Sequence, residues 1–151
     1  NYSLCPDIVT TAKGLGGGLP IGAVIFGEKL STTVTPGSHG STFGGNPIVA
    51  AGAISIVERM DENFLADVRA KGKYITDYIK NIKGVKDISG MGLMIGILTD
   101  KNASDIAKEC LKNGLLVLTA HKNKVRLLPA LNINYNEIDE GLKILKEVIE
   151  K

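Results

Sequence analysis

The sequence has 151 residues, of which 44% are hydrophobic and 23% are charged, as is typical of a soluble globular protein with one core or two small ones. A net charge of +2 without a run of basic residues gives no support for nucleic acid or a membrane as partner, and the apolar runs are too short for a transmembrane span. Two cysteines and two histidines exclude a disulfide framework and a histidine-rich metal site. We expect a cytoplasmic protein with no metal, and a fragment, because the chain begins at Asn1 directly before a strand pattern.

The first predicted element is a strand at residues 7–11, which leads into Lys13 and a glycine-rich turn. Gly14 and the glycines at 16–18 end the strand abruptly and let another group approach the backbone closely. A lysine amine becomes a nucleophile once burial or a nearby cation favours its neutral form, and it can then form a Schiff base with an aldehyde. A solvated loop lysine is the alternative. A phosphate-binding P-loop is excluded, because there the glycines precede the lysine.

A strand, a loop and a helix follow the lysine turn. The continuous apolar run at 21–27 predicts a strand buried on both faces of a sheet, so that the turn lies between two strands. Residues 36–47 form a long loop in which the N–H groups of 40–45 would make an anion-binding concavity, with a flexible surface loop as the alternative. Asn46 and Pro47 predict the start of a helix to about residue 60, whose small apolar residues indicate burial.

The pattern changes near residue 61 from an apolar helix to an amphipathic one, and we place a domain boundary there. Helix and strand patterns alternate after this point, which predicts a small α+β layer of a few strands covered on one side by helices. Gly114 is predicted to end one helix in a left-handed conformation. The predicted helices span residues 63–81, 104–112 and 136–149, and the predicted strands span 88–98, 115–118 and 124–128.

Four motifs together resemble the C-terminal part of the class III pyridoxal-phosphate-dependent aminotransferases, which have fold type I. The resemblance covers nearly the whole chain and keeps the family's order. It implies an α/β fold in which residues 1–60 end the large cofactor-binding domain and residues 61–151 form the small C-terminal α+β domain. The motifs are TAKGLGGG at 11–18, HGSTFGGNP at 39–47, GLMIG at 92–96 and VRLLP at 125–129.

The resemblance also implies roles for four residues. Lys13 would bind pyridoxal 5′-phosphate covalently and then act as the acid and base of the reaction. Thr42, with Ser41 beside it, matches the position that reaches the cofactor phosphate of the neighbouring subunit, which implies a homodimer with shared active sites. Arg126 matches the arginine that binds the substrate carboxylate, a task suited to a planar guanidinium. A solvated strand residue is the alternative for Arg126.

The implied reaction transfers an amino group between N2-acetylornithine and 2-oxoglutarate, which becomes glutamate, in arginine biosynthesis. Ornithine and 4-aminobutyrate are the alternative donors, because the family builds its side-chain pocket largely from residues upstream of this segment. The chain departs from the family pattern at Ala130, where a second proline is usual, and at His121, where glycine is frequent.

A hypothesis of a different kind is a non-catalytic folding or interaction module. The family's phosphate loop, its ring-stacking aromatic residue and the aspartate that pairs with the pyridine nitrogen all lie upstream, so we expect this fragment to be inactive alone. The apolar side chains of Val24, Ile25 and Ile54 would then be exposed and would favour self-association.

Overall fold

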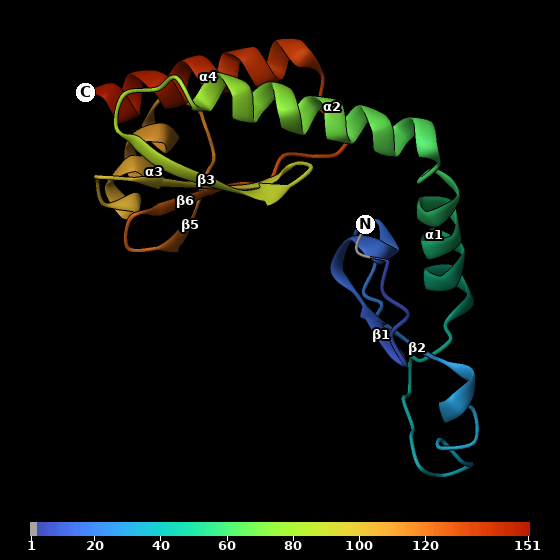
Figure 1. The fold of residues 1–151 in the computed structure, drawn as a ribbon. Helices are drawn as coiled ribbons and strands as arrows, with labels where there is room; N and C mark the ends of the chain where they lie inside the picture. The colour runs from blue at the N-terminus through green and yellow to red at the C-terminus, as the bar shows by residue number, and fades with distance from the viewer. Residues whose placement is uncertain (1–2) are drawn as a thin grey trace. The chain divides into compact units, whose positions relative to one another are not determined.

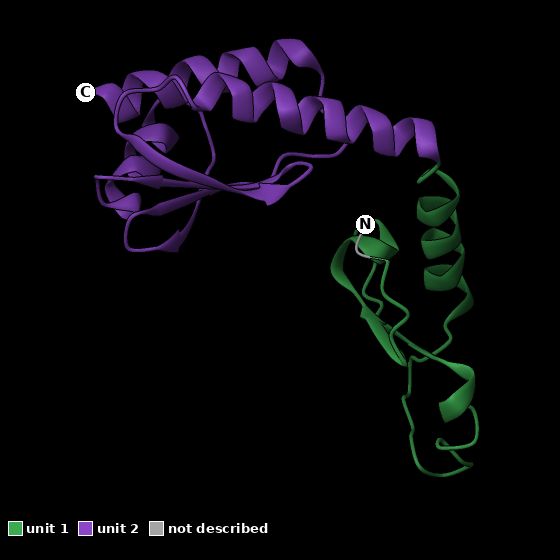
Figure 2. Cartoon of the chain, in the orientation of Figure 1, with its two compact units in different colours: residues 1–61 green, residues 62–151 purple. Residues whose placement is uncertain are grey.

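A computed structural model describes residues 3–151, which fall into two compact units, unit 1 up to residue 61 and unit 2 from residue 62 to residue 151 (Figures 1 and 2). The assignment of these units to a large and a small domain of the family fold stays a prediction. Within the described residues, no helix has both the length and the apolar character needed to cross a lipid bilayer.

Unit 1 is built on a hairpin of two antiparallel strands, β1 (Ile8–Thr11) and β2 (Ala23–Phe26). The lysine turn joins them, as predicted, and it includes the 3-10 helix η1 (Lys13–Gly16). A second 3-10 helix, η2 (Glu28–Leu30), precedes the long loop, and helix α1 (Pro47–Glu58) follows it. The predicted start of α1 is confirmed, because the Asn46 side chain accepts hydrogen bonds from two backbone N–H groups of the first turn.

The predicted burial of β2 and α1 is wrong for the described residues. Val24 and Ile25 are 53% and 59% exposed, and Ala53 is the one buried residue among those of α1. Two strands and one helix do not supply the layers needed to cover a strand on both faces. The expectation that the apolar side chains of Val24, Ile25 and Ile54 would be exposed is confirmed.

Unit 2 is a four-stranded antiparallel sheet in the order β3-β4-β6-β5 with three helices on one face, which confirms the predicted α+β layer (Figure 1). Helices α2 and α4 pack against each other, while α2 also contacts β3 and β4 and α3 contacts β5 and β6. The elements are α2 (Glu62–Ile79), β3 (Val85–Met91), β4 (Met94–Thr99), α3 (Ala103–Lys112), β5 (Leu118–His121), β6 (Lys124–Leu127) and α4 (Tyr135–Glu150).

The core of unit 2 lies between the sheet and the helices. Ile97 of β4 and Val125 of β6 face each other in register, and both are fully buried. Ile79 and Leu145 are also fully buried, from α2 and α4. Each such side chain contributes about 1.5–3 kcal/mol to folding through the apolar surface it removes from water.

Two strand predictions in unit 2 are wrong. Residues 88–98 form no single strand but the hairpin of β3 and β4, because Gly92 adopts a φ of +55° and turns the chain back. The predicted strand at 115–118 begins only at Leu118, because the Leu115 N–H donates to Cys110 O at 2.9 Å and so belongs to the end of α3. Gly114 has a φ of +88° there, which confirms its predicted left-handed conformation.

Candidate active site

Lys13 opens the turn between β1 and β2 with a backbone conformation that is unusual for its type. Its φ is +54°, in the left-handed region, where a residue with a Cβ carries a cost of about 1–2 kcal/mol. The Lys13 side chain is exposed, and within residues 3–151 its amine has no ion pair or hydrogen bond. Such strain persists only when its surroundings hold it, and it is concentrated at functional sites. The strained backbone marks Lys13 as a candidate functional residue, while its side chain is not buried by the described part of the chain.

The lysine turn is held in place by close packing on helix α1. A Cβ on Gly52 of α1 would lie 2.9 Å from Leu19 Cδ1, the movable end of a side chain, and 3.4 Å from the carbonyl oxygen of Gly16, so the helix and the turn are in close contact here. Gly17 has a φ of +61°, and a Cβ there would lie 2.9 Å from Cδ1 of Ile56 on the same helix. The small residues of α1 therefore position the turn, a role that the sequence pattern alone did not indicate.

The second candidate segment is the loop that precedes α1. Ser38 ties its first part together, because its hydroxyl donates to Thr35 O at 2.6 Å and accepts from the Thr35 N–H at 3.0 Å. A turn follows in which the Gly44 N–H donates to Ser41 O at 3.3 Å. The side chains of Ser41 and Thr42 are exposed and have no hydrogen-bond partner within the described part of the chain. Their hydroxyl groups are therefore available to an anion.

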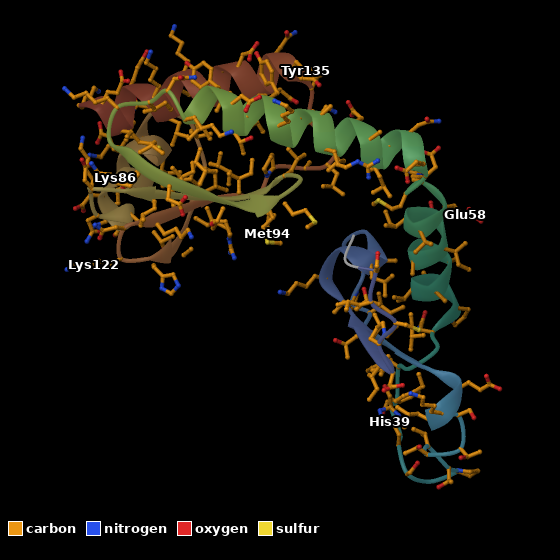
Figure 3. All side chains as sticks on the ribbon, viewed as in Figure 1. His39, Glu58, Lys86, Met94, Lys122 and Tyr135 are labelled. Carbon is orange, nitrogen blue, oxygen red and sulfur yellow. The ribbon has the colours of Figure 1, made fainter. Side chains whose placement is uncertain are left out.

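The structure does not bring Lys13 and Thr42 together within unit 1. The strand pairing places the lysine turn next to the pair Thr11 and Ala23, whereas the chain leaves for the loop beyond the opposite pair, Ile8 and Phe26. Figure 1 shows the loop at the end of the hairpin away from the lysine turn, and Figure 3 shows His39 of this loop there. The two segments therefore lie at opposite ends of the hairpin.

Arg126 lies in unit 2, at the centre of β6. Its backbone is paired with Gly96 of β4 on one side and with Leu118 of β5 on the other. Its side chain lies on the sheet face opposite to that of the buried Val125. The Nε atom of Arg126 is buried and has no hydrogen-bond partner in the structure. Buried donors are almost always paired, so this atom indicates an acceptor that the described residues do not supply. A carboxylate placed side-on against the guanidinium would provide it.

A family model described as aminotransferase class-III matches residues 1–149. The chain belongs to the class-III aminotransferases. This confirms the resemblance carried by the four motifs. Among the described residues of this class-III chain, no group of three or more His, Cys, Asp or Glu side chains is arranged to hold a metal ion.

Named relatives agree with this family. The acetylornithine aminotransferase of Haemophilus ducreyi is 44% identical over 152 residues, which cover 99% of this chain and 38% of the relative. The acetylornithine aminotransferase of Listeria innocua is 46% identical over 153 residues, which cover 98% of this chain and 40% of the relative. The chain thus spans about two fifths of the length of the relatives it matches.

Solved structures confirm the fold as that of the C-terminal part of a pyridoxal-phosphate-dependent aminotransferase. The ornithine delta-aminotransferase of Plasmodium falciparum superposes with a TM-score of 0.86 at 30% identity, covering 99% of this class-III chain and 41% of the other chain. An S-selective transaminase from Arthrobacter sp. has a TM-score of 0.90 at 23% identity, with coverages of 99% and 39%, and this likeness concerns the fold alone.

Proposed function

We propose that the full-length protein carrying this chain is a pyridoxal-phosphate-dependent aminotransferase that transfers an amino group between N2-acetylornithine and 2-oxoglutarate in arginine biosynthesis. The observation that carries the proposal is Lys13, an unpaired amine on a strained left-handed backbone within a chain of the class-III family. Relatives of 44% and 46% identity that are named acetylornithine aminotransferases support the choice of donor. Cytoplasmic location stays a prediction.

The residues present fit the cofactor. In the lysine turn, a Cβ on Gly14 or Gly18 would meet no described atom within 4 Å, so the backbone beside Lys13 is open to the approach of another group. When bound, pyridoxal phosphate supplies an electron sink for charge that develops on the substrate's α-carbon. Lys13 Nζ would anchor the cofactor covalently and, once released by the incoming amino group, would carry the proton that leaves the α-carbon.

Thr42 and Ser41 are the proposed phosphate contacts. Their unpaired hydroxyls lie on a loop with several free N–H groups, which is the kind of concavity that binds anions. Because this loop lies at the end of the hairpin away from Lys13, we propose that it serves the cofactor of a second subunit. The protein would then be a homodimer with shared active sites.

Arg126 is the proposed substrate-binding residue. A guanidinium is always charged and offers parallel N–H donors, so it can hold a carboxylate in one orientation. The unpartnered Nε of Arg126 supports this role, because a side-on carboxylate would satisfy it. Holding the carboxylate in one place would orient the bond from the α-carbon that must break.

Two alternatives have support of their own. Ornithine as the donor is favoured by the solved ornithine delta-aminotransferase, which is 30% identical to this chain. A non-catalytic module is favoured by the exposed apolar residues of unit 1, and we propose in any case that these 151 residues are inactive alone. 4-Aminobutyrate remains a third donor to test.

The deciding experiment maps the cofactor in the full-length protein. Borohydride reduction followed by peptide mapping should find the cofactor on Lys13, and Lys13→Ala should abolish turnover. Lys29→Ala is the matched control, because Lys29 is an exposed lysine of the same unit that pairs with Asp7 at 3.1 Å. Cofactor fixed on another lysine would overturn the aminotransferase proposal.

A donor panel tests the substrate. Rates with N2-acetylornithine, ornithine and 4-aminobutyrate should be compared at equal concentrations, with 2-oxoglutarate as the acceptor. A clear preference for ornithine or 4-aminobutyrate would replace the proposed donor and leave the reaction class in place.

A further inference from the structure

Strand β3 forms one edge of the sheet of unit 2. The sheet has the order β3-β4-β6-β5, so within the described residues β3 has β4 as its sole strand partner. An edge strand presents backbone N–H and C=O groups with which another strand can pair. Ile88 of β3 packs against the core below the helices, and Gly90, two positions further on the same face, has no side chain. β3 therefore offers a backbone edge with open space on its helix side.

A groove with a volume of about 330 Å³ lies between β3 and helix α2, which covers this side of the sheet (Figure 1). Its strand side includes the residues of β3 from Ile88 to Met91. Its helix side includes a row of four polar residues of α2, which we call the α2 row. These residues are separated by four, three and four positions, so they share one face of the helix. The α2 row consists of Arg69, Lys73, Thr76 and Lys80.

The α2 row carries more positive charge than its present partners neutralise. Arg69, Lys73 and Lys80 are all exposed. Arg69 pairs with Glu62, while both lysines pair with the same carboxylate, that of Asp77. Exposed ion pairs of this kind contribute little to stability, so the carboxylates of a partner can replace them. The groove thus combines a surplus of positive charge with a strand edge.

The dimensions of the α2 row match an extended peptide. Lys80 is 11 positions after Arg69, which corresponds to roughly 16 Å along a helix. Five residues of an extended strand cover a similar length at about 3.3 Å per residue. Alternate side chains of such a strand are roughly 6.6 Å apart, close to the roughly 6 Å that separate Arg69 and Lys73 along the helix axis.

The charge also decides between two kinds of occupant. A second copy of this chain that paired through its own β3 would place two α2 rows on the same sheet face. Their like charges would repel, which disfavours this pairing. A segment with acidic side chains would instead be attracted to the groove.

We propose that β3 and the α2 row form a docking groove for an extended acidic segment of a partner protein, which adds to the four-stranded sheet as a further strand. Backbone hydrogen bonds to β3 would hold the segment, and its helix-facing carboxylates would be selected by Arg69, Lys73 and Lys80. The inference goes beyond the proposed reaction, in which none of these residues takes part.

The test uses the full-length protein and a fluorescent seven-residue peptide in which glutamate alternates with valine. Fluorescence anisotropy should show saturable binding that weakens as salt is added, because exposed charges are screened. The double substitution Lys73→Glu and Lys80→Glu should weaken binding about tenfold. The control, Lys143→Glu with Lys146→Glu, changes the net charge equally at two exposed positions of α4 and should leave the affinity unchanged.

A milder pair of substitutions keeps the test independent of folding. Lys73→Gln with Lys80→Gln removes the two charges without reversing them and should weaken binding about threefold. An unchanged melting temperature would show that each variant is folded. No binding of the peptide, or equal weakening by the α2 and α4 charge reversals, would overturn the proposal.

Hydrogen exchange separates strand addition from loose charge attraction. The peptide should slow exchange of the β3 amides that do not bond to β4, and a peptide with every backbone nitrogen methylated should not bind, because it has no N–H to donate. Binding that leaves β3 exchange unchanged would overturn the proposal. Protection of the same amides in the free full-length protein would also overturn it, because the protein's own chain would then occupy the edge.

Discussion

At the scale of single residues, the two cysteines show how packing decides reactivity. Burial and, secondarily, the neighbouring Glu109 carboxylate raise the pKa of Cys110 to about 11, while Cys5 is exposed. The thiolate is the reactive form, so Cys110 stays a protonated and inert thiol near neutral pH. We expect Ellman's reagent at pH 8 to modify Cys5 in the native protein and Cys110 only after unfolding. Rapid native modification of Cys110 would contradict the buried core position.

The candidate residues could be predicted from sequence to different degrees. Lys13 stands out locally, because a lone lysine between a strand and a glycine run has few structural reasons to be there. Its left-handed backbone could not be predicted, because a positive φ is expected of glycine and not of lysine. The proximity of Lys124 to Gly96 could not be predicted either, because it depends on the pairing of β4 with β6, which are far apart in sequence.

At the scale of elements, helix α2 crosses the β3–β4 hairpin at a point where a glycine is required. A Cβ on Gly72 would lie 2.3 Å from the Gly92 carbonyl oxygen, which is backbone and cannot move aside cheaply. We expect Gly72→Ala to destabilise unit 2 by about 1–3 kcal/mol, although alanine is the better helix former. Hydrogen exchange of the α2 and β4 amides in the full-length protein would measure the change.

A second helical glycine gives the matched control. Gly141 lies in α4, and a Cβ there would be 3.3 Å from Cδ1 of Leu115, the flexible end of a side chain. Gly141→Ala should leave exchange unchanged or slow it, because the gain in helix propensity of up to about 1 kcal/mol meets little obstruction. Equal effects of the two substitutions would show that the backbone contact of Gly72 carries no special cost.

The elements themselves were predictable where their ends carry local signals. Asn46 and Pro47 mark the start of α1, and the periodic apolar residues of α4 mark its buried face. The β3–β4 hairpin was missed, because an apolar run punctuated by glycine reads equally as one long strand. Only the pairing of Met91 with Met94 reveals the turn. The start of β5 was missed because Leu115 is apolar yet serves to close α3.

At the scale of the whole molecule, two features of unit 1 lead to predictions about its oligomeric state: the exposed apolar side chains and the loop with Thr42. Val24, Ile25 and Ile54 are each more than half exposed, and a surface of this kind favours association. We expect the 151-residue chain to sediment as an oligomer at micromolar concentration. A well-behaved monomer under these conditions would contradict this expectation.

The shared active site of the proposed dimer can be tested by mixing defects. Lys13→Ala and Thr42→Ala subunits of the full-length protein, co-expressed with different tags, would be purified as heterodimers. If Thr42 serves the partner's cofactor, one of the two sites contains neither defect, so turnover should reach about half that of the wild type. The assay uses a cofactor concentration at which the Thr42→Ala homodimer is largely empty.

The opposite arrangement gives a different result. If Thr42 serves the cofactor of its own subunit, each site of the heterodimer has one defect. Turnover would then stay near the low value of the Thr42→Ala homodimer, which would overturn the proposal of sites shared between subunits.

The left-handed backbone of Lys13 sets stability and catalysis against each other at one position. Glycine adopts a φ of +54° freely, whereas a side chain adds about 1–2 kcal/mol of strain there. Among inactive variants, Lys13→Gly should therefore melt higher than Lys13→Ala in the cofactor-free protein. Selection of a mutant library for thermal resistance alone would replace this lysine with glycine, whereas selection for growth would restore it. At position 13, the substitution that raises thermal stability therefore removes the proposed catalytic amine.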